Sequence, residues 1–311
     1  MESVLTATGL VKSYGKVRAV DGIDLAVYPK EVYGLLGPNG SGKTTTLSML
    51  AGILRPDSGQ VRVAGIPVTH SAARARLGLV PQEIALYPQM TAAENLAFFG
   101  RMQGMTGKTL RTRVDEVLEI VDLTARAKQR VERFSSGMKR RVNIAVALVH
   151  SPDLLIMDEP TVGVDPQSRN AILDQVNALA AAGTAVIFAS HYMEEVQRLC
   201  NRIAIIDAGK ILATGTVREL LSDSPSRTRI VLTVAAGEEE RLHSLVQDLP
   251  GDAEVQGSGQ ELHLLASKPA ELLTPLLRAA EAAGVLLQGV QLIQPSLEDV
   301  FLELTGKALR E

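Results

Sequence analysis

Stretches of apolar and polar positions along the chain predict a mixed fold of strands and helices. Residues 4–12 and 17–28 have the pattern of two antiparallel strands, and 32–36 that of a short buried strand. Residues 92–103 and 110–121 show the apolar spacing of amphipathic helices. From residue 153 onward, strand and helix patterns alternate, at Leu154–Met157, Ala171–Leu179, Ala185–Ala189 and Met193–Leu199. That alternation predicts a parallel sheet covered by helices, which Ile203–Asp207 and Ile211–Thr214 close as a hairpin.

A break in composition at Ser222-Asp223-Ser224-Pro225-Ser226 predicts a linker between two domains, 1–224 and 225–311. Beyond it the pattern gives the order βαββαβ, which indicates a small ferredoxin-like α+β domain. Its elements are Arg229–Val234, Glu239–Asp248, Ala253–Gln256, Glu261–Ala266, Ala270–Ala282 and Val285–Leu292.

The tail from Ser296 to Leu304 predicts a self-capped helix with one apolar face, formed by Leu297, Val300, Phe301 and Leu304. Packing of this face on its own domain is the favoured interpretation. Docking to a partner is the alternative.

Composition and charge exclude several classes of protein. With 311 residues and 46% apolar content, the chain can bury one large core and a smaller one. No apolar run approaches the ~20 residues needed to span a bilayer, and residues 1–10 lack the pattern of an export signal. The single cysteine, Cys200, excludes an internal disulfide framework.

Charge is distributed unevenly between the two predicted domains. Residues 1–224 hold 25 Lys and Arg against 22 Asp and Glu, whereas residues 225–311 hold 7 against 13. The smaller domain is therefore acidic, which argues against a nucleic-acid-binding appendage. The basic run Lys139-Arg140-Arg141 is interpreted as a solvated helix start.

The strongest chemical signal is a phosphate-binding loop that matches G-x-x-x-x-G-K-[ST] between a buried strand and a helix. It comprises Gly37, Pro38, Asn39, Gly40, Ser41, Gly42, Lys43 and Thr44, with Thr45 following in the helix. Glycines let successive backbone N–H groups converge on phosphate oxygens at a helix N-terminus. Lys43 is predicted to reach the β- and γ-phosphates and Thr44 to ligate Mg²⁺.

A second apolar strand ends in two carboxylates, at Leu154-Leu155-Ile156-Met157-Asp158-Glu159. Such a strand delivers acids to the edge of a parallel sheet. Paired with the phosphate-binding loop, Asp158 is predicted to hold Mg²⁺ through water and Glu159 to polarise the attacking water. An acidic turn before Pro160 is the alternative.

The segment Phe134-Ser135-Ser136-Gly137-Met138 resembles the signature motif of ATP-binding-cassette (ABC) ATPases. Other residues match that family in order: Gln82 its glutamine loop, Asp165 its D-loop, His191 its switch histidine and Tyr14 the aromatic that stacks on adenine. Singly, Gln82 could be a surface amide, His191 a helix cap and Tyr14 a core aromatic. Their joint order favours the functional interpretation over residues 1 to about 220. Positions three and five of this segment, usually Gly and Gln in the family, are Ser136 and Met138 here.

The resemblance implies a P-loop ATPase core with an antiparallel β subdomain and a helical subdomain. It further implies catalytic roles for Glu159, His191 and Gln82, Mg²⁺ ligation by Thr44, Gln82 and Asp158, and nucleotide contacts from Tyr14 and Asp165. In this family the signature closes over ATP on the opposite subunit, which implies that role for Ser135 and Gly137. For Ser136 between them, weaker closure and an additional ligand are the alternatives. Two chains are therefore expected, most simply a homodimer, with a homologous subunit as the alternative.

The phrase from Pro295 to Phe301 is similar to the ending of ATPases from ABC-2-type drug and polysaccharide exporters. The resemblance implies a protein at the cytoplasmic face of the membrane, bound to an integral membrane permease and driving export with ATP and Mg²⁺. Tyr87 and the run Leu96-Ala97-Phe98-Phe99 fall where such a permease docks. A soluble ABC ATPase acting on nucleic acid or the ribosome is the alternative function.

Overall fold

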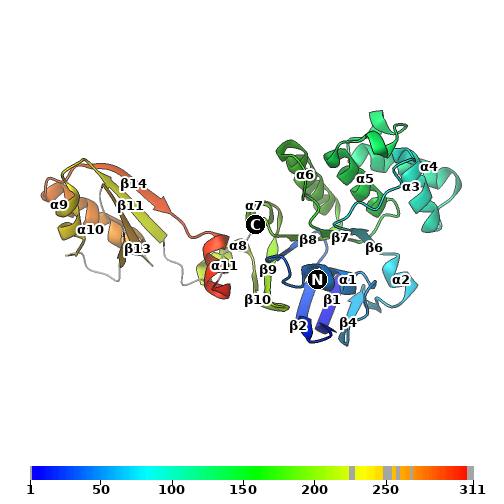
Figure 1. Cartoon of the computed structure of the whole chain (residues 1–311), viewed down its shortest axis with the longest axis horizontal. Coiled ribbons are helices and arrows are strands. Elements are labelled where there is room, and N and C mark those ends of the chain that lie inside the picture. Colours follow the sequence, from blue (N-terminus) through cyan, green and yellow to red (C-terminus); the bar gives the residue numbers. More distant parts are fainter. Residues whose placement is uncertain (1, 224–227, 248–253, 257–259, 267–268, 307–311) are drawn as a thin grey trace. The chain divides into compact units, whose positions relative to one another are not determined.

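The computed structural model describes residues 2–223, 228–247, 254–256, 260–266 and 269–306, which fall into two compact units (Figure 1). The division lies between Val217 and Arg218. The predicted linker at 222–226 falls mostly outside the described residues, and its first two residues end helix α8 (Val217–Asp223). A domain boundary at residue 224 remains a prediction.

The first unit is built on a six-stranded sheet in the order β10-β9-β3-β8-β7-β6. Neighbouring strands from β9 to β6 are parallel, and β10 pairs with β9 as the antiparallel hairpin that the pattern predicted. Because parallel strands end at one edge, the residues after β3, β7 and β8 gather there. The strands are β3 (Val32–Leu36), β6 (Leu77–Val80), β7 (Leu154–Asp158), β8 (Ala185–Ser190), β9 (Arg202–Asp207) and β10 (Lys210–Gly215).

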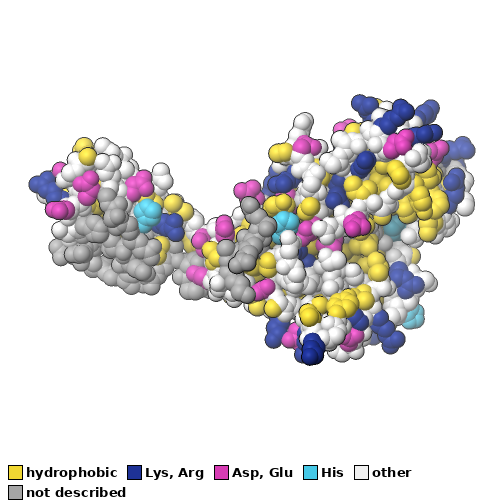
Figure 2. Space-filling view, in the orientation of Figure 1, with side chains coloured by type: hydrophobic (Ala, Val, Ile, Leu, Met, Phe, Trp, Pro, Cys, Tyr) yellow, Lys and Arg dark blue, Asp and Glu magenta, His cyan; other side chains and the backbone are white. Residues whose placement is uncertain are grey.

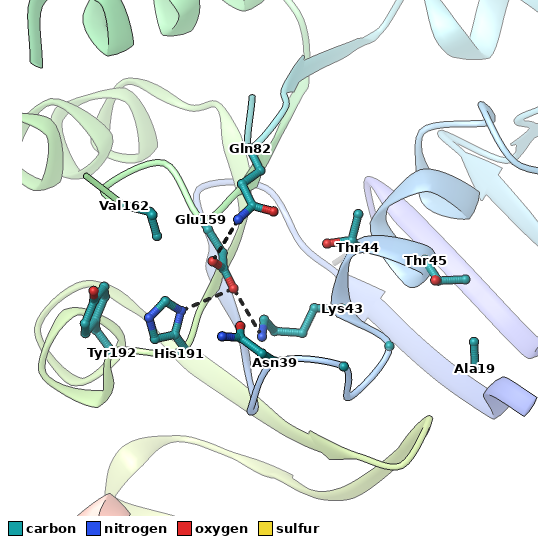
Figure 3. Close-up of a pocket in the computed structure, with 12 residues that line it drawn as sticks. Ala19, Asn39, Lys43, Thr44, Thr45, Gln82, Glu159, Val162, His191 and Tyr192 are labelled. Carbon is teal, nitrogen blue, oxygen red and sulfur yellow. Dashed lines mark hydrogen bonds and ion pairs between the residues drawn. The ribbon is translucent and has the colours of Figure 1, made fainter. Parts of the chain in front are cut away.

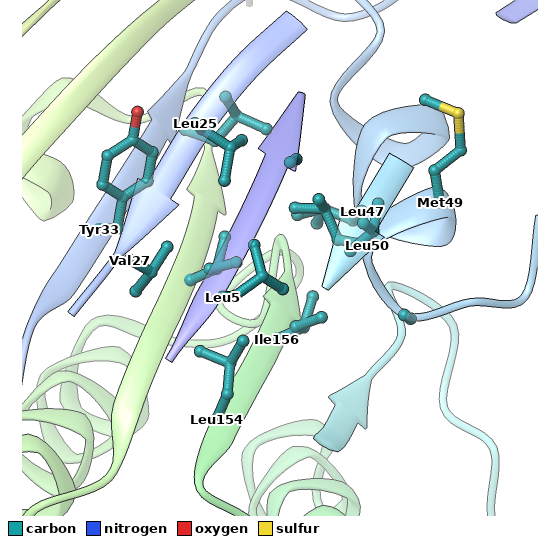
Figure 4. Close-up of a cluster of buried hydrophobic side chains, with 14 of the residues drawn as sticks. Leu5, Leu25, Val27, Tyr33, Leu47, Met49, Leu50, Leu154 and Ile156 are labelled. Atoms are coloured by element: carbon teal, nitrogen blue, oxygen red, sulfur yellow. The ribbon is translucent and has the colours of Figure 1, made fainter. Parts of the chain in front are cut away.

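A second, antiparallel sheet has the order β2-β1-β4-β5. Strands β1 (Leu5–Tyr14) and β2 (Val17–Val27) confirm the predicted pair, whereas β4 (Ser58–Val63) and β5 (Ile66–Pro67) were not predicted. Helix α1 (Lys43–Leu50) contacts both sheets. Its Leu47 and Leu50 share one buried cluster with side chains of both sheets, including Leu5, Val27, Leu154 and Ile156 (Figure 4).

Three helices of the first unit pack against one another: α3 (Ala92–Met102), α4 (Gly107–Ile120) and α5 (Ser136–Leu148). Helix α5 also contacts β6. Helices α6 (Pro166–Ala182) and α7 (Met193–Leu199) contact the six-stranded sheet. The short α2 (Ser71–Arg74) lies against β4 and β5, and two 3₁₀ turns, Thr124–Arg126 and Val131–Arg133, lead from α4 to α5. The predicted antiparallel and helical subdomains are therefore both present.

The second unit carries a four-stranded antiparallel sheet in the order β12-β13-β11-β14. Its chain order after α8 is βαββαβ, as predicted, and each βαβ pair has another strand between its two strands, which is consistent with a ferredoxin-like fold. The last strand begins at Leu287 instead of the predicted Val285. The elements are β11 (Thr228–Val234), α9 (Glu239–Gln247), β12 (Glu254–Gln256), β13 (Glu261–Ala266), α10 (Pro269–Ala282) and β14 (Leu287–Ile293).

Helix α11 (Leu297–Thr305) begins with the predicted capping box, in which Ser296 Oγ accepts from Asp299 N (3.2 Å) and Asp299 Oδ2 accepts from Ser296 N (2.7 Å). Three members of its predicted apolar face, Leu297, Val300 and Phe301, are buried within the chain, while Leu304 is exposed. Burial leaves these three side chains unable to serve as an exposed docking face.

Candidate functional site

Close backbone approaches explain why glycine occupies two positions of the loop between β3 and α1. A Cβ on Gly37 would clash with the carbonyl oxygen of Ile206, and one on Gly42 with that of Ala19. Gly42 also has a left-handed φ of 105° immediately before α1. Only glycine therefore fits at these two positions of the loop.

Lys43 is the first residue of α1 and is almost completely buried. Its Nζ donates to the carbonyl oxygens of Gly37 (2.7 Å) and Pro38 (3.0 Å) and lies 3.3 Å from Glu159 Oε1. Burial lowers the pKa of Lys43, and the carboxylate of Glu159 opposes that shift. The ammonium group is thus held at the loop by carbonyls and one carboxylate.

Three side chains from separate segments converge on Glu159 (Figure 3). Besides Lys43, Gln82 Nε2 donates to Glu159 Oε2 at 3.5 Å, and His191 Nδ1 lies 3.2 Å from Oε1 without hydrogen-bond alignment. Glu159 itself adopts a left-handed φ of 46°, and its N–H donates to Ala189 O (3.0 Å). A left-handed backbone conformation is strained for a non-glycine residue. Such strain at the end of a central strand is typical of functional sites.

Asp158 and Thr44 form the second polar pair of the site. The carboxyl of Asp158 is buried, interacts with the Thr44 side chain, and leaves Oδ1 without a hydrogen-bond partner. Burial raises the pKa of Asp158, while the hydrogen bond from Thr44 lowers it by a smaller amount. A buried carboxylate oxygen beside a hydroxyl is the oxygen donor set that Mg²⁺ prefers.

The pocket around these groups has a volume of about 570 Å³. Nine predicted site residues line it, namely Asn39, Gly40, Gly42, Lys43, Thr44, Thr45, Gln82, Glu159 and His191. Ala19, Val162 and Tyr192 complete the lining and were not predicted. Tyr14 ends β1, is 53% exposed and is not among the lining residues.

The signature segment and Asp165 also lie outside this pocket's lining. Ser135 caps α5 and accepts from Met138 N (3.3 Å), with Ser136 exposed beside it. Asp165 caps α6 and accepts from Ser168 N (2.9 Å), a hydrogen bond that lowers the pKa of the Asp165 carboxyl. A Cβ on Gly137 would clash with Ser168, so the N-termini of α5 and α6 pack closely.

Two buried residues that contact segments of the site escaped the sequence analysis. Arg140 of α5, interpreted from the sequence as part of a solvated basic run, is 4% exposed and donates to the carbonyls of Pro81 (3.1 Å) and Gln82 (2.8 Å). Glu195 of α7 accepts hydroxyl hydrogen bonds from two other segments. Both partnerships are tertiary, and neither residue stands in a motif that sequence spacing could have singled out.

Replacing Asp158 by Asn should stabilise the nucleotide-free protein. Because burial raises this pKa above 3.8, the folded state binds the Asp158 proton more tightly than the unfolded chain, and ionisation at higher pH weakens folding. Near neutral pH we expect Asp158→Asn to raise the free energy of unfolding by ~1 kcal/mol, which corresponds to a rise of a few degrees in Tm. The gain should shrink as the pH falls toward ~4. Thermal unfolding without Mg²⁺ or nucleotide across this range measures it, and a gain that does not change with pH would contradict it.

Comparison with known proteins shows the family of this chain. The ABC transporter family profile matches residues 20–162. The linearmycin resistance ATP-binding protein LnrL of Bacillus subtilis is 47% identical over 99% of this chain and 100% of its own length. A Nod factor export ATP-binding protein I of Cupriavidus metallidurans is 41% identical over the full length of both chains.

Solved structures show the same fold over part of the chain. One described as an ATP-binding subunit of an ABC transporter is 27% identical, with a TM-score of 0.64 over 70% of this chain and 92% of that one. Another, a dimeric post-hydrolysis state of the ATP-binding cassette MJ0796 with ADP and Pi, is 25% identical, with a TM-score of 0.62 over 68% of this chain and 98% of that one.

Fold and site together define a P-loop ATPase of the ATP-binding-cassette class. The chain belongs to the ABC transporter family, whose ATP-binding domains bind and hydrolyse ATP to power transport.

Proposed function

We propose that this chain is the energising subunit of an ABC-2-type export system, in which its ATP-driven dimerisation moves a membrane permease. The observation that carries the proposal is the convergence of Lys43, Gln82 and His191 on Glu159 in a chain similar over its whole length to export ATP-binding proteins. Lys43 and the loop N–H groups bind the phosphates, Glu159 polarises the attacking water, and His191 and Gln82 position it around the γ-phosphate. Tyr14 stacks on adenine.

The donor set fits Mg²⁺. Asp158 Oδ1 is buried and unpartnered beside the Thr44 hydroxyl, and Gln82 can bring its amide oxygen to the same space. When bound, the ion supplies positive charge to the phosphate oxygens. Thr44, Asp158 and Gln82 are its proposed ligands, directly or through water.

A second chain completes the site. Ser135, Ser136 and Gly137 do not line the pocket of their own chain, although their helix N-terminus suits an anion. The solved dimer of a related cassette supports pairing of two such chains. In the proposed homodimer the signature of each chain, with Asp165 nearby, closes over the nucleotide held by the other.

The permease is proposed to dock beside α3, where Tyr87, Phe98 and Phe99 form one aromatic cluster with ring centroids 4.9–6.1 Å apart. Tyr87 is 47% exposed. A groove of about 760 Å³ between α3 and α4 is lined by apolar residues such as Met90, Ala97 and Leu110 and by charged ones such as Glu94 and Arg101. Hydrophobic side chains gather over these helices in Figure 2. Interfaces favour such aromatic and apolar surfaces.

No described helix has the length and apolar character of a membrane span. We therefore assign membrane attachment, on the cytoplasmic side, to the permease contact. The alternative function is that of a soluble ABC ATPase acting on nucleic acid or the ribosome. The excess of acidic over basic residues in 225–311 gives it no support.

Affinity purification tests the proposal. Tagged Glu159→Gln protein is purified with ATP from detergent-solubilised native membranes, beside the exposed control Glu119→Gln, and the co-purified proteins are identified. We expect a multi-spanning membrane protein, enriched by the hydrolysis-deficient variant and depleted when Tyr87→Ala is added. Recovery of ribosomes, nucleic acid or only soluble proteins would favour the alternative function.

A further inference from the structure

Glu195 is a buried carboxylate outside the nucleotide pocket, on helix α7, with 3% exposure. Its Oε2 accepts from Thr161 Oγ1 (2.8 Å) and from Ser190 Oγ (2.9 Å). Its Oε1 lies 3.4 Å from Arg169 Nε on α6, without hydrogen-bond alignment. One side chain thereby joins the turn after β7, the last residue of β8 and helix α6.

The segments that Glu195 joins carry the groups that face the γ-phosphate in the proposed function. Ser190 directly precedes His191, and its Oγ also accepts from Tyr192 N (3.0 Å). Thr161 stands two residues after Glu159 and at the start of the loop that ends at Asp165. The carboxylate therefore ties the turn that bears His191 to the turn that bears Glu159.

Arg169, the third partner of Glu195, also lies close to the residues that follow Ser190. Its guanidinium carbon lies 4.7 Å from the ring centroid of Tyr192, which is itself 4.1 Å from the His191 ring. Thr161 and Arg169 stand on either side of the loop 162–165, so Glu195 connects both ends of that loop to the histidine turn.

A purely structural role would not require an ionisable group here. Thr161 and Ser190 are 0% and 1% exposed, and a buried carboxylate is expensive unless its partners are well placed. Burying three polar side chains together gives a network with a single preferred geometry. Such a network suits alignment of the 3.2 Å approach between His191 and Glu159.

We propose that Glu195 is a positioning residue that aligns His191 with Glu159 and transmits the position of loop 162–165 to both. The proposal rests on the proposed function, in which that loop faces the second subunit. Displacement of the loop on dimer closure moves Thr161 and Arg169, and through Glu195 it moves the backbone that carries His191. Hydrolysis is thereby coupled to closure by one buried carboxylate.

Glu195→Gln tests this role, with its exposed neighbour Glu194→Gln as the matched control. The glutamine retains the shape of Glu195 but turns an amide group toward Arg169 or a hydroxyl. We expect kcat for ATP to fall about tenfold with KM nearly unchanged, because misplacement of catalytic groups lowers the rate more than binding. Glu194→Gln should leave both values unchanged, and Glu195→Asp should recover part of the lost rate.

A double-mutant cycle with His191→Ala separates positioning from general loss of stability. If Glu195 acts through His191, Glu195→Gln should have little further effect in the His191→Ala background. An equal fold-loss of kcat in both backgrounds would overturn the proposal.

Histidine NMR provides a readout independent of hydrolysis. The chain has five histidines, and the His191 imidazole signal is assigned by its loss in His191→Ala. It should shift in Glu195→Gln and in Thr161→Val but not in Glu194→Gln. An unmoved signal overturns the inference even if the wild-type protein hydrolyses no ATP, whereas absent hydrolysis with a shifted signal counts against the proposed function alone.

Discussion

Glu159→Gln is expected to lower ATP turnover by about 10²–10³-fold while leaving ATP binding intact. Glutamine retains the size and one acceptor oxygen of Glu159, so it can still contact Gln82 and Lys43. It cannot polarise an attacking water as a carboxylate does. Because the phosphate-binding loop is unchanged, ATP should remain bound and hold two chains together.

Steady-state hydrolysis, equilibrium binding of ATP and size-exclusion chromatography with ATP and Mg²⁺ measure the three expected effects. Glu119→Gln on the outer face of α4 makes the same chemical change at an exposed position and should behave as wild type. Hydrolysis by Glu159→Gln at the wild-type rate would show that another group activates the water. Loss of ATP binding would instead assign Glu159 a role in holding Lys43.

The linear motifs predicted much of the candidate site because several of them follow a strand of the parallel sheet. Lys43, Glu159 and His191 follow β3, β7 and β8, and parallel strands deliver such residues to one edge whatever the intervening sequence. Their gathering at one edge of the sheet could therefore be expected from the motifs. The direct contacts of Lys43 and His191 with Glu159 were not predicted.

Elements with weak local patterns were not predicted. Strand β4 contains Ser58, Gly59 and Gln60 and buries only Val61 and Val63, and β6 has four residues including Gly78. Each is held by pairing with a neighbour, β1 and β7 respectively, and pairing is not written in the short segment itself.

Buried polar contacts were equally beyond the sequence. Arg140 stands in a run of three basic residues, yet its guanidinium is buried against the carbonyls of Pro81 and Gln82, and burial lowers its pKa. This contact links the signature helix α5 to the loop that carries Gln82. A sequence shows the charge of such a residue but not the carbonyls that fold around it.

The placement of Ser136 makes the two-chain site directly testable. Ser136 is exposed in the first turn of α5, where a negative charge suits the helix dipole. Ser136→Glu should therefore preserve folding while placing a carboxylate against the γ-phosphate of the nucleotide on the other chain. We expect loss of hydrolysis, whereas Ser71→Glu at the exposed start of α2 should have no effect.

Combining Ser136→Glu with Glu159→Gln in one heterodimer should restore activity that neither variant has alone. The Ser136→Glu chain keeps its Glu159 and receives an intact signature from the Glu159→Gln chain, so one of the two sites contains no altered group. A heterodimer isolated through two different tags should therefore reach up to about half of the wild-type rate. If each chain instead built its site alone, each site of the heterodimer would contain one of the two altered residues. Alternatively, Ser136→Glu would affect neither site and would already be active alone. An inactive, correctly assembled heterodimer would then reject the shared site, because only exchange of the signature between chains brings the two unaltered halves together.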